Sequence, residues 1–335
     1  MINEFRQESM KNADVALITS NIHINYFLYE YGLDGILMIR RNGKDHFYCC
    51  GHKRTLLCES VVTISFHNDI ESCMSCAIRD LACGDVKTIG LEIRNIAYQW
   101  GAQIESLNLS IYPMDKEIIA ARMTKDVREI YRIEDNIKVL SMIIQQTRMK
   151  LHSSTSEKDI IKMFRKCCID FGVIECFISA KREFYDDNFY VSIDCGVEWE
   201  GYYSDITRNI CVSSCAEELL PKHLFLCELI EWMKYQICEG VSLKGIFYQM
   251  HKEWRKHHLY AFLHKGYGHM IGKNVHEPHS ITWQSDFVFR EGMVFTLEPA
   301  LGGNPYYRIE DMFMIKGGSA VCLTEAIPRN LWVID

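Results

Sequence analysis

The chain has 335 residues, 48% of them hydrophobic and 12% aromatic, which is enough for about two domains with real cores. It carries a net charge of −7, has no long basic run and has no stretch of about 18 or more apolar residues. These features argue against a nucleic-acid partner, an anionic-membrane partner and a membrane span. The N-terminus lacks an apolar signal segment and the 15 cysteines are scattered through apolar runs, so we expect a cytoplasmic protein with reduced thiols.

The first part of the chain alternates strand-like runs with helix-compatible segments. The two helical segments are residues 69–83 and 95–106, and the strand-like runs are VALITS, GILMIRR, DHFYCC, VVTISF and KTIGLE. Such alternation is typical of a small α/β domain. Pro113 then breaks the pattern, and we place a domain boundary near residue 120, which gives domains 1–120 and 121–335.

The second part begins with helices. Thr124 is a candidate N-cap for a long amphipathic helix whose apolar side chains recur every three or four residues, at Val127, Ile130, Ile133, Ile137, Leu140 and Ile144. A second helix is predicted from Ser156, with Gly172 as its stop, and two more at 217–239 and 243–257. Strand-like segments follow to the C-terminus, so this domain is predicted to be α+β, with helices framing an antiparallel sheet.

Residues 193–209, IDCGVEWEGYYSDITRN, read as a hairpin that carries two aspartates. If its turn is centred on Trp199 and Glu200, Asp194 lies directly opposite Asp205. Opposed residues have Cβ atoms about 4.5 to 5.5 Å apart, where like charges destabilise the pair. We therefore expect a cation between them, although two exposed aspartates on a solvated hairpin are the alternative.

Three later segments also place acids or histidines in strand-like sequence: GYGHMIGKNVHEPHSI, GMVFTLEPAL and YYRIEDMFMI. Glu298 and Glu310 interrupt apolar runs, so both are predicted to be buried. A buried carboxylate must be protonated, hydrogen-bonded or bound to a cation. A salt-bridged core acid explains either glutamate alone, but four carboxylates and His269 together are explained most economically by a pair of divalent ions.

The order of these motifs resembles a known family. D-x10-D, GHxxG, a His-Glu pair seven residues after the motif histidine, FTxEP and RIED occur in this order here, as they do in the pita-bread metallopeptidases. That family includes methionine aminopeptidase, Xaa-Pro aminopeptidase and prolidase, with creatinase as a metal-free relative. The resemblance covers roughly residues 120–335. Residues 14–92 resemble, more faintly, the N-terminal domain of the creatinase and Xaa-Pro aminopeptidase branch. The resemblance implies a pita-bread catalytic domain, a creatinase-type N-terminal domain and a homodimer.

The resemblance also implies a set of five metal ligands: Asp194, Asp205, His269, Glu298 and Glu310, with Asp205 and Glu310 bridging two ions. Four carboxylates and one imidazole favour manganese, iron or cobalt, with zinc as the alternative. Such an ion pair holds a bridging water, lowers its pKa toward about 7 and polarises a substrate carbonyl.

Four residues are assigned roles around this chemistry. By resemblance, Glu298 also shuttles the proton to the leaving amine, and His276 contacts the substrate and stabilises the tetrahedral intermediate. The alternative for His276 is a histidine merely packed beside the site. Lys265 and Arg308 are assigned to substrate binding.

The segments expected to face the substrate depart from the Xaa-Pro-cleaving pattern. Lys265 stands where relatives have a histidine, and no histidine lies between Phe171 and Asp194, where the chain offers Lys181 and Arg182 instead. The sequence therefore predicts an anionic group on the substrate, held by Lys265, and poor cleavage of prolyl dipeptides.

Three functions follow from these observations. The first is a dinuclear metallopeptidase of the aminopeptidase or dipeptidase class, which hydrolyses a peptide or amide bond of a small substrate. The second is a metal-dependent hydrolase or lyase of the same fold that acts on a non-peptide small molecule. The third is a non-catalytic binding module. It is the least favoured, because binding alone does not require all five metal ligands to be kept.

Overall fold

The computed structural model describes residues 1–51, 62–185, 188–303 and 306–334. The chain divides into two compact units, Met1–Arg122 and Met123–Asp335. Among the described residues, the helices are too short or too polar to cross a membrane.

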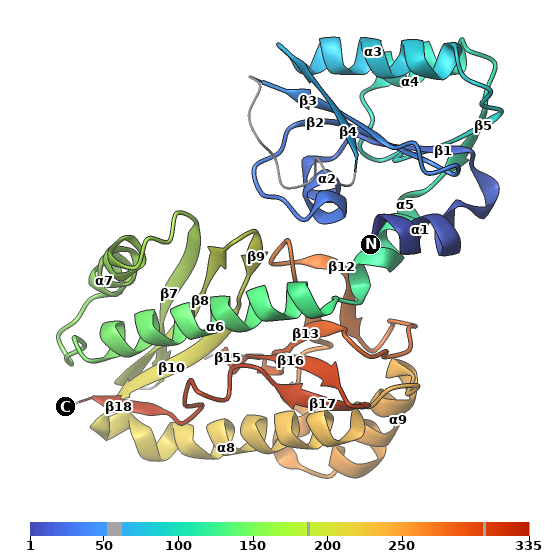
Figure 1. Ribbon diagram of the computed structural model, residues 1–335. Helices are drawn as coiled ribbons and strands as arrows, with labels where there is room; N and C mark the ends of the chain where they lie inside the picture. Colours follow the sequence, from blue (N-terminus) through green and yellow to red (C-terminus); the bar gives the residue numbers. More distant parts are fainter. Residues whose placement is uncertain (52–61, 186–187, 304–305, 335) are drawn as a thin grey trace. The chain divides into compact units, whose positions relative to one another are not determined.

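The first unit is built on a mixed six-stranded sheet in the order β4-β3-β2-β1-β5-β6 (Figure 1). Its strands are β1 Val15–Ile18, β2 Gly35–Arg40, β3 His46–Cys50, β4 Thr63–His67, β5 Thr88–Leu91 and β6 Ser110–Pro113. Its helices are α1 Ile2–Ser9, η1 Met10–Asn12, α2 Asn21–Leu28, α3 Ile70–Ala82, α4 Tyr98–Glu105 and α5 Asp115–Met123. The predicted strands and the two predicted helices are all present, but the short edge strand β6 was not predicted.

Both faces of this sheet are covered because its central strands are apolar on both sides. Leu17 and Met38 face α3 and α4 within one core cluster. Ala16 and Leu37, one residue away on the same strands, face α1, α2 and α5 within another. This explains why β1 and β2 read as continuous apolar runs.

The second unit contains two larger sheets and a short strand pair. The first sheet has the order β18-β10-β8-β7, with β9 paired to β8, and the second has the order β12-β11-β13-β16-β17. Their strands are β7 Cys176–Tyr185, β8 Asn188–Trp199, β9 Tyr202–Tyr203, β10 Ile206–Val212, β11 Gly266–Met270, β12 Glu277–Thr282, β13 Val294–Leu297, β16 Asp311–Lys316, β17 Ser319–Cys322 and β18 Trp332–Ile334, and the short pair is β14 Ala300–Leu301 with β15 Tyr307–Arg308. All pairings in this unit are antiparallel except β10 with β18.

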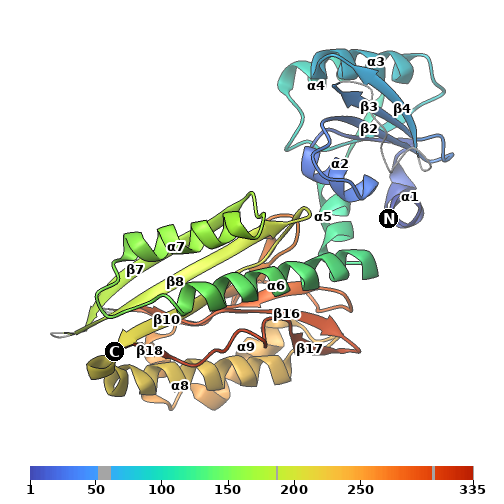
Figure 2. The same ribbon diagram turned by 60° about the vertical axis from the view of Figure 1, so that its left-hand side comes forward.

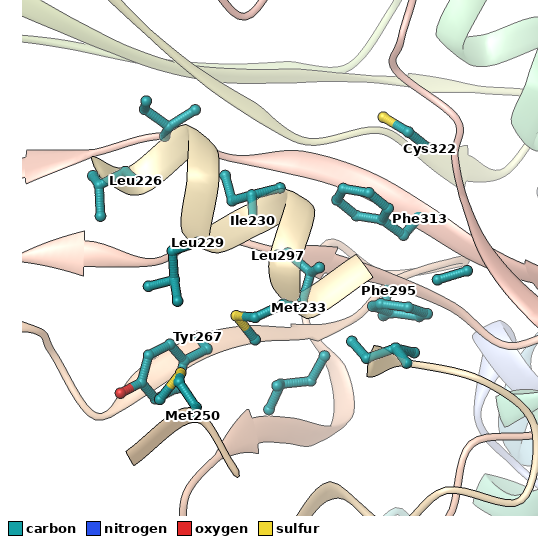
Figure 3. Close-up of a cluster of buried hydrophobic side chains, with 14 of the residues drawn as sticks. Leu226, Leu229, Ile230, Met233, Met250, Tyr267, Phe295, Leu297, Phe313 and Cys322 are labelled. Atoms are coloured by element: carbon teal, nitrogen blue, oxygen red, sulfur yellow. The ribbon is translucent and has the colours of Figure 1, made fainter. Parts of the chain in front are cut away.

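Helices cover the sheets of the second unit on two sides, as predicted. They are α6 Val127–Arg148, α7 Glu157–Asp170, α8 Ser213–Gln236, α9 Leu243–Trp254 and η3 His258–Phe262. Figure 2 shows α6 and α7 over β7, β8 and β10, and α8 on the other side. The larger core cluster, which lies between α8, α9 and the second sheet, is drawn in Figure 3 and includes Leu226, Leu229, Ile230, Met233, Met250, Tyr267, Phe295, Leu297 and Phe313.

The long helix α6 begins two residues later than predicted. Its N-cap is Asp126, not Thr124, and the Asp126 side chain accepts hydrogen bonds from the backbone N–H groups of Arg128 and Glu129. The Glu129 carboxylate in turn accepts from the backbone N–H of Asp126, which completes a capping box. The start of α7 is as predicted, since Ser156 caps it by accepting from the backbone N–H of Asp159.

The predicted hairpin register is also wrong by two residues. Asp194 pairs with Thr207, not with Asp205, because the two-residue turn is centred on Glu200 and Gly201. Both turn residues have positive φ, 51° and 81°, which suits glycine at the second position. A shift of two keeps each side chain on its face, so Asp194 and Asp205 remain on the same side of the hairpin as diagonal neighbours.

A buried histidine on α8 gives the second unit a pH-dependent stability. His223 accepts or donates one hydrogen bond at Nδ1, 2.8 Å from the Tyr307 hydroxyl, and burial lowers its pKa from about 6.5 to about 4. The unfolded chain therefore binds a proton that the folded chain does not between these values, so this contribution is complete above about pH 6.5 and is lost as the pH falls toward 4.

We expect wild type to lose about 2 kcal/mol more unfolding free energy than His223→Gln between about pH 7.5 and pH 5, a figure that follows from the two pKa values. Urea unfolding followed by tryptophan fluorescence measures this, because five of the six tryptophans lie in the second unit. Identical pH dependence of the two proteins would show that His223 does not stay neutral in the fold.

Candidate metal centre

Three of the predicted ligands converge in the second unit. The Nε2 atom of His269 lies 3.5 Å from Oδ2 of Asp205 and 3.8 Å from Oε1 of Glu310. One ligand atom from each of the three residues falls within a group no more than 4.8 Å across, and all three side chains are buried. No other such group of three is found among the described residues.

The other two predicted ligands, Asp194 and Glu298, lie beside this group and are joined by Arg308. The Arg308 guanidinium donates to the Asp194 carboxylate and, at 2.8 Å, to Oε2 of Glu298. Oε1 of Glu298 is 3.6 Å from Nε2 of His269, so Glu298 also borders the buried group. Arg308, predicted to bind substrate, acts here as the counter-ion of two carboxylates.

Short segments from both sheets position these side chains. Asp194 is on β8, His269 is on β11 and Asp205 precedes β10, whereas Glu298 follows β13 and Glu310 precedes β16. The sheets meet where Thr207 pairs with Glu310 in an isolated bridge. The Glu310 carboxylate is fixed there by the Thr207 hydroxyl, which donates to Oε2 at 2.8 Å.

Close backbone packing brings β11 against β13 beside His269. Gly268 has a φ of 150°, and a Cβ atom at this position would lie 2.0 Å from the carbonyl oxygen of Thr296. The Thr296 hydroxyl accepts a hydrogen bond from the backbone N–H of His269 at 3.1 Å. Gly268, the first glycine of the GHxxG motif, is therefore required, because a side chain would collide with Thr296 and would strain the positive φ.

The electrostatics of the centre favour a bound cation. Burial raises the pKa of Asp205 well above its usual range, and the charges of Asp194 and Glu298 raise it further. The pKa of Glu310 is raised well above its usual range by burial, then by Asp205 and Glu298. Arg308 opposes both shifts but does not cancel them. The carboxylates therefore resist ionisation together unless more positive charge is supplied.

Two buried oxygens of the centre have no hydrogen-bond partner: Oδ1 of Asp205 and Oε1 of Glu310. Leaving such atoms unpaired costs free energy, whereas a cation would satisfy both. The oxygen-rich set with one imidazole also suits manganese, iron or cobalt. The residues present thus fit a metal site. The unpaired oxygens belong to Asp205 and Glu310, the two residues predicted to bridge a pair of ions.

A second layer of contacts, which sequence reasoning did not predict, holds the backbone of these ligands. Arg208, adjacent to Thr207, is fully buried and donates to the carbonyl oxygen of Glu310 at 2.6 Å and to the Asp311 carboxylate at 2.6 Å. Asp311 also accepts from Arg329 and from the Thr324 hydroxyl. The sequence did hold a signal for these contacts, because Arg208 and Asp311 are charged residues within otherwise apolar strands.

His276 lies next to the centre. Its ring centre is 4.2 Å from that of His269, and burial followed by the nearness of His269 lowers its pKa. It lines a cleft of about 930 Å³ together with all five predicted ligands and Arg308. The structure therefore places His276 where it can reach a molecule bound in the cleft.

The turn that carries His276 is fixed by a buried ion pair. The Lys125 ammonium donates to the Glu277 carboxylate at 3.2 Å, and both side chains are almost fully buried. The same carboxylate accepts from the backbone N–H of Lys273 at 2.9 Å. Lys125 thus connects the start of α6 to the 272–277 turn.

We expect Lys125→Met to destabilise the second unit by about 3 kcal/mol or more, because it leaves the buried Glu277 without this ammonium. The exposed pair of Lys138 with Asp135 supplies a matched control, and Lys138→Met should cost less than about 0.5 kcal/mol. Urea unfolding at neutral pH measures both. Equal effects would mean that the buried pair does not stabilise the turn.

The cations predicted to face the substrate lie elsewhere. Lys265 is not among the residues that line the cleft, and its ammonium lies 4.9 Å from the ring centre of Trp283. Lys181 pairs with Glu183, and Arg182 pairs with Glu157 at 3.2 Å. Substrate binding by Lys265 stays a prediction that this geometry does not favour.

Comparison with known proteins identifies the class. Residues 119–317, more than half of the chain, match metallopeptidase family M24. The chain therefore belongs to this family of peptidases, and the family predicted from the sequence is confirmed.

Individual relatives agree with this assignment. The Xaa-Pro dipeptidase of Pyrococcus furiosus is 33% identical over 230 residues, which cover 67% of this chain and 62% of that protein. An uncharacterized peptidase of Staphylococcus aureus is 22% identical over 339 residues, 94% of this chain and 95% of that protein. Among solved structures, an X-Pro aminopeptidase from Thermotoga maritima aligns over 98% of this chain and 100% of its own, with a TM-score of 0.82 and 23% identity. The predicted fold, a pita-bread domain preceded by a smaller α/β domain, is confirmed.

Proposed function

We propose that this protein is a dinuclear metal-dependent peptidase that cleaves a peptide or amide bond of a small substrate. The observation that carries the proposal is the cluster of buried carboxylates around His269, because Asp205 and Glu310 each have one buried oxygen without a hydrogen-bond partner. Manganese, iron or cobalt are the ions we propose, with zinc as the alternative.

The proposed ligands are Asp194, Asp205, His269, Glu298 and Glu310. When two divalent ions are bound, they would lower the pKa of a shared water and polarise the substrate carbonyl. Arg308 contacts Oδ2 of Asp194 and Oε2 of Glu298, so the second oxygen of each carboxylate can still be offered to an ion. Arg308 also lines the cleft, which is compatible with its predicted role in substrate binding.

Two residues of the cleft are proposed to handle protons and charge. Glu298 is the more accessible of the two glutamates, so its carboxylate can take a proton from the nucleophile and deliver it to the leaving amine. His276 has a lowered pKa and is therefore a neutral imidazole with one N–H donor near neutral pH. That donor can stabilise the negative charge that develops on the substrate oxygen.

An activity screen tests the proposal. The protein, stripped of metal and reloaded separately with Mn²⁺, Co²⁺, Fe²⁺ and Zn²⁺, is incubated with di- and tripeptides, including X-Pro sequences, and with non-peptide amides. We expect metal-dependent cleavage of at least one class of short peptide. Turnover of non-peptide amides alone would favour the second function, and no turnover with any ion would favour a binding module.

The second candidate function, a hydrolase or lyase that acts on a non-peptide small molecule, is supported by the departures from the Xaa-Pro pattern. Lys265 replaces a histidine, and the segment from Phe171 to Asp194 has none. Homodimerisation and a cytoplasmic location remain predictions.

A further inference from the structure

The cleft beside the metal centre contains a cation that the sequence reasoning did not consider. Arg165, on α7, lines the cleft together with Cys168 and Ile169. The spacing of these three residues puts them on one face of the helix. The Arg165 side chain is exposed to solvent. It lies on the wall of the cleft that α7 and the turn after it form.

Arg165 differs from the other arginine of the cleft in its partners. Arg308 is held by Asp194 and Glu298. Arg165 forms no ion pair with a carboxylate of the described residues, whereas its neighbours Lys162 and Lys166 pair with Asp159 and Asp170. An unpaired guanidinium in a concave site is suited to a carboxylate, which it can bind with two parallel hydrogen bonds.

Much of this wall is apolar, and two of its aliphatic side chains are unusually exposed. Ile169 and Ile174 are 74% and 87% exposed, and both line the cleft, as do Val173 and Phe177. Large aliphatic side chains that remain exposed beside a binding cleft mark a surface that a ligand can cover. The wall therefore offers an apolar surface with one cation, Arg165, and one carboxylate, Glu175.

We propose that the cleft binds a short peptide whose free C-terminal carboxylate is held by Arg165 and whose large apolar side chain packs on Ile169 and Ile174. The proposal rests on the proposed peptidase function and assigns its substrate class. It gives Arg165, rather than Lys265, the role of recognising the anionic group.

One acidic residue of the same wall has to be compatible with a bound carboxylate. Glu175 lines the cleft, and its Oε2 accepts a hydrogen bond from the Tyr203 hydroxyl at 2.7 Å. This contact directs the Glu175 carboxylate toward Tyr203. Glu175 also gives the cleft a group that disfavours a second anion on the substrate.

The test compares leucyl-leucine with leucyl-leucine amide, which differ in the C-terminal charge. We expect wild type to prefer the free acid by about ten-fold or more in kcat/KM, the scale of a charge-assisted contact, and Arg165→Met to show no preference. Lys166→Met is the matched control, since it removes a neighbouring charge that does not line the cleft. Lys166→Met and Lys265→Met should both keep the preference.

A preference that persists in Arg165→Met, or that disappears in Lys265→Met instead, would overturn the proposal. The apolar part is tested by Ile174→Ser, which should lower kcat/KM for leucyl-leucine about ten-fold while changing that for glycyl-glycine little. Equal losses for both dipeptides would contradict apolar recognition.

A binding measurement separates this proposal from the proposed function. Calorimetric titration of the metal-free protein with the two leucyl ligands needs no catalysis. Tighter binding of the acid by wild type, lost in Arg165→Met, supports the carboxylate site even if no peptide is cleaved. Equal or undetectable binding of the two ligands by wild type, with equal kcat/KM, would overturn the carboxylate site and leave the peptidase function to its own screen.

Discussion

Asp205→Asn should lose most of its bound metal and lower turnover about 10³-fold or more, equivalent to about 4 kcal/mol of transition-state stabilisation. Asp205 is buried, its Oδ1 atom has no partner, and its carboxylate lies 3.5 Å from the imidazole of His269. An asparagine in its place has no negative charge and only one oxygen to offer. Elemental analysis of the dialysed protein and kcat measured with saturating metal test the two effects.

The control for this variant is Asp135→Asn, on an exposed face of α6 and paired only with Lys138 among the ion pairs described. It should retain full metal content and activity. If Asp205→Asn also retains both, Asp205 is not a bridging ligand and the assignment of the centre is wrong.

His276→Ala should lower turnover about 10²-fold or more while the metal content stays unchanged, which is the usual scale for a positioned donor or proton-transfer group. The imidazole lies 4.2 Å from that of His269, with the two rings tilted by 49°, and lines the cleft, but it does not belong to the buried three-residue group. Steady-state kinetics and elemental analysis of the same preparation measure both quantities.

His264 provides the comparison, because it is exposed and is not among the residues lining the cleft. His264→Ala should keep turnover close to that of wild type. Loss of metal together with the His276 imidazole would make His276 a ligand and overturn its predicted role.

Much of the fold was predictable because local signals agree with the tertiary structure. The predicted apolar stripe of α6 is buried from Ile133 to Ile144, whereas Val127 at its start is 66% exposed. Helix α7 starts after Ser156 and stops before Gly172, as predicted. The error at the start of α6 arose because Thr124 and Asp126 are both good N-caps. Only Asp126 has a glutamate three residues later to complete the capping box.

Strand register was less predictable than strand existence. A hairpin centred on Glu200 and Gly201 instead of Trp199 and Glu200 preserves the alternation of faces, so the apolar pattern alone does not distinguish the two. The glycine was the available signal, because two successive positive φ values favour glycine at the second turn position.

The site was predictable where a motif fixes a residue type and unpredictable where the contact is long-range. His269 and Glu310 follow from the chemistry of buried acids beside a histidine. Lys265 lies over the ring of Trp283 next to β11 and β12, and the pairing of these two strands contains two register shifts that the sequence pattern does not reveal. Arg165 lies in an ordinary amphipathic helix, and only the three-dimensional structure shows that it faces the cleft.

The number of metal ions bound per chain decides whether this protein is a dinuclear peptidase. Protein stripped with a chelator is titrated with Mn²⁺ in a calorimeter while peptidase activity is measured at each addition. A dinuclear peptidase should bind two ions per chain, with activity that rises from none to its maximum as the sites fill. Full activity in the metal-free protein, or saturation of both binding and activity at one ion or fewer per chain, would contradict it.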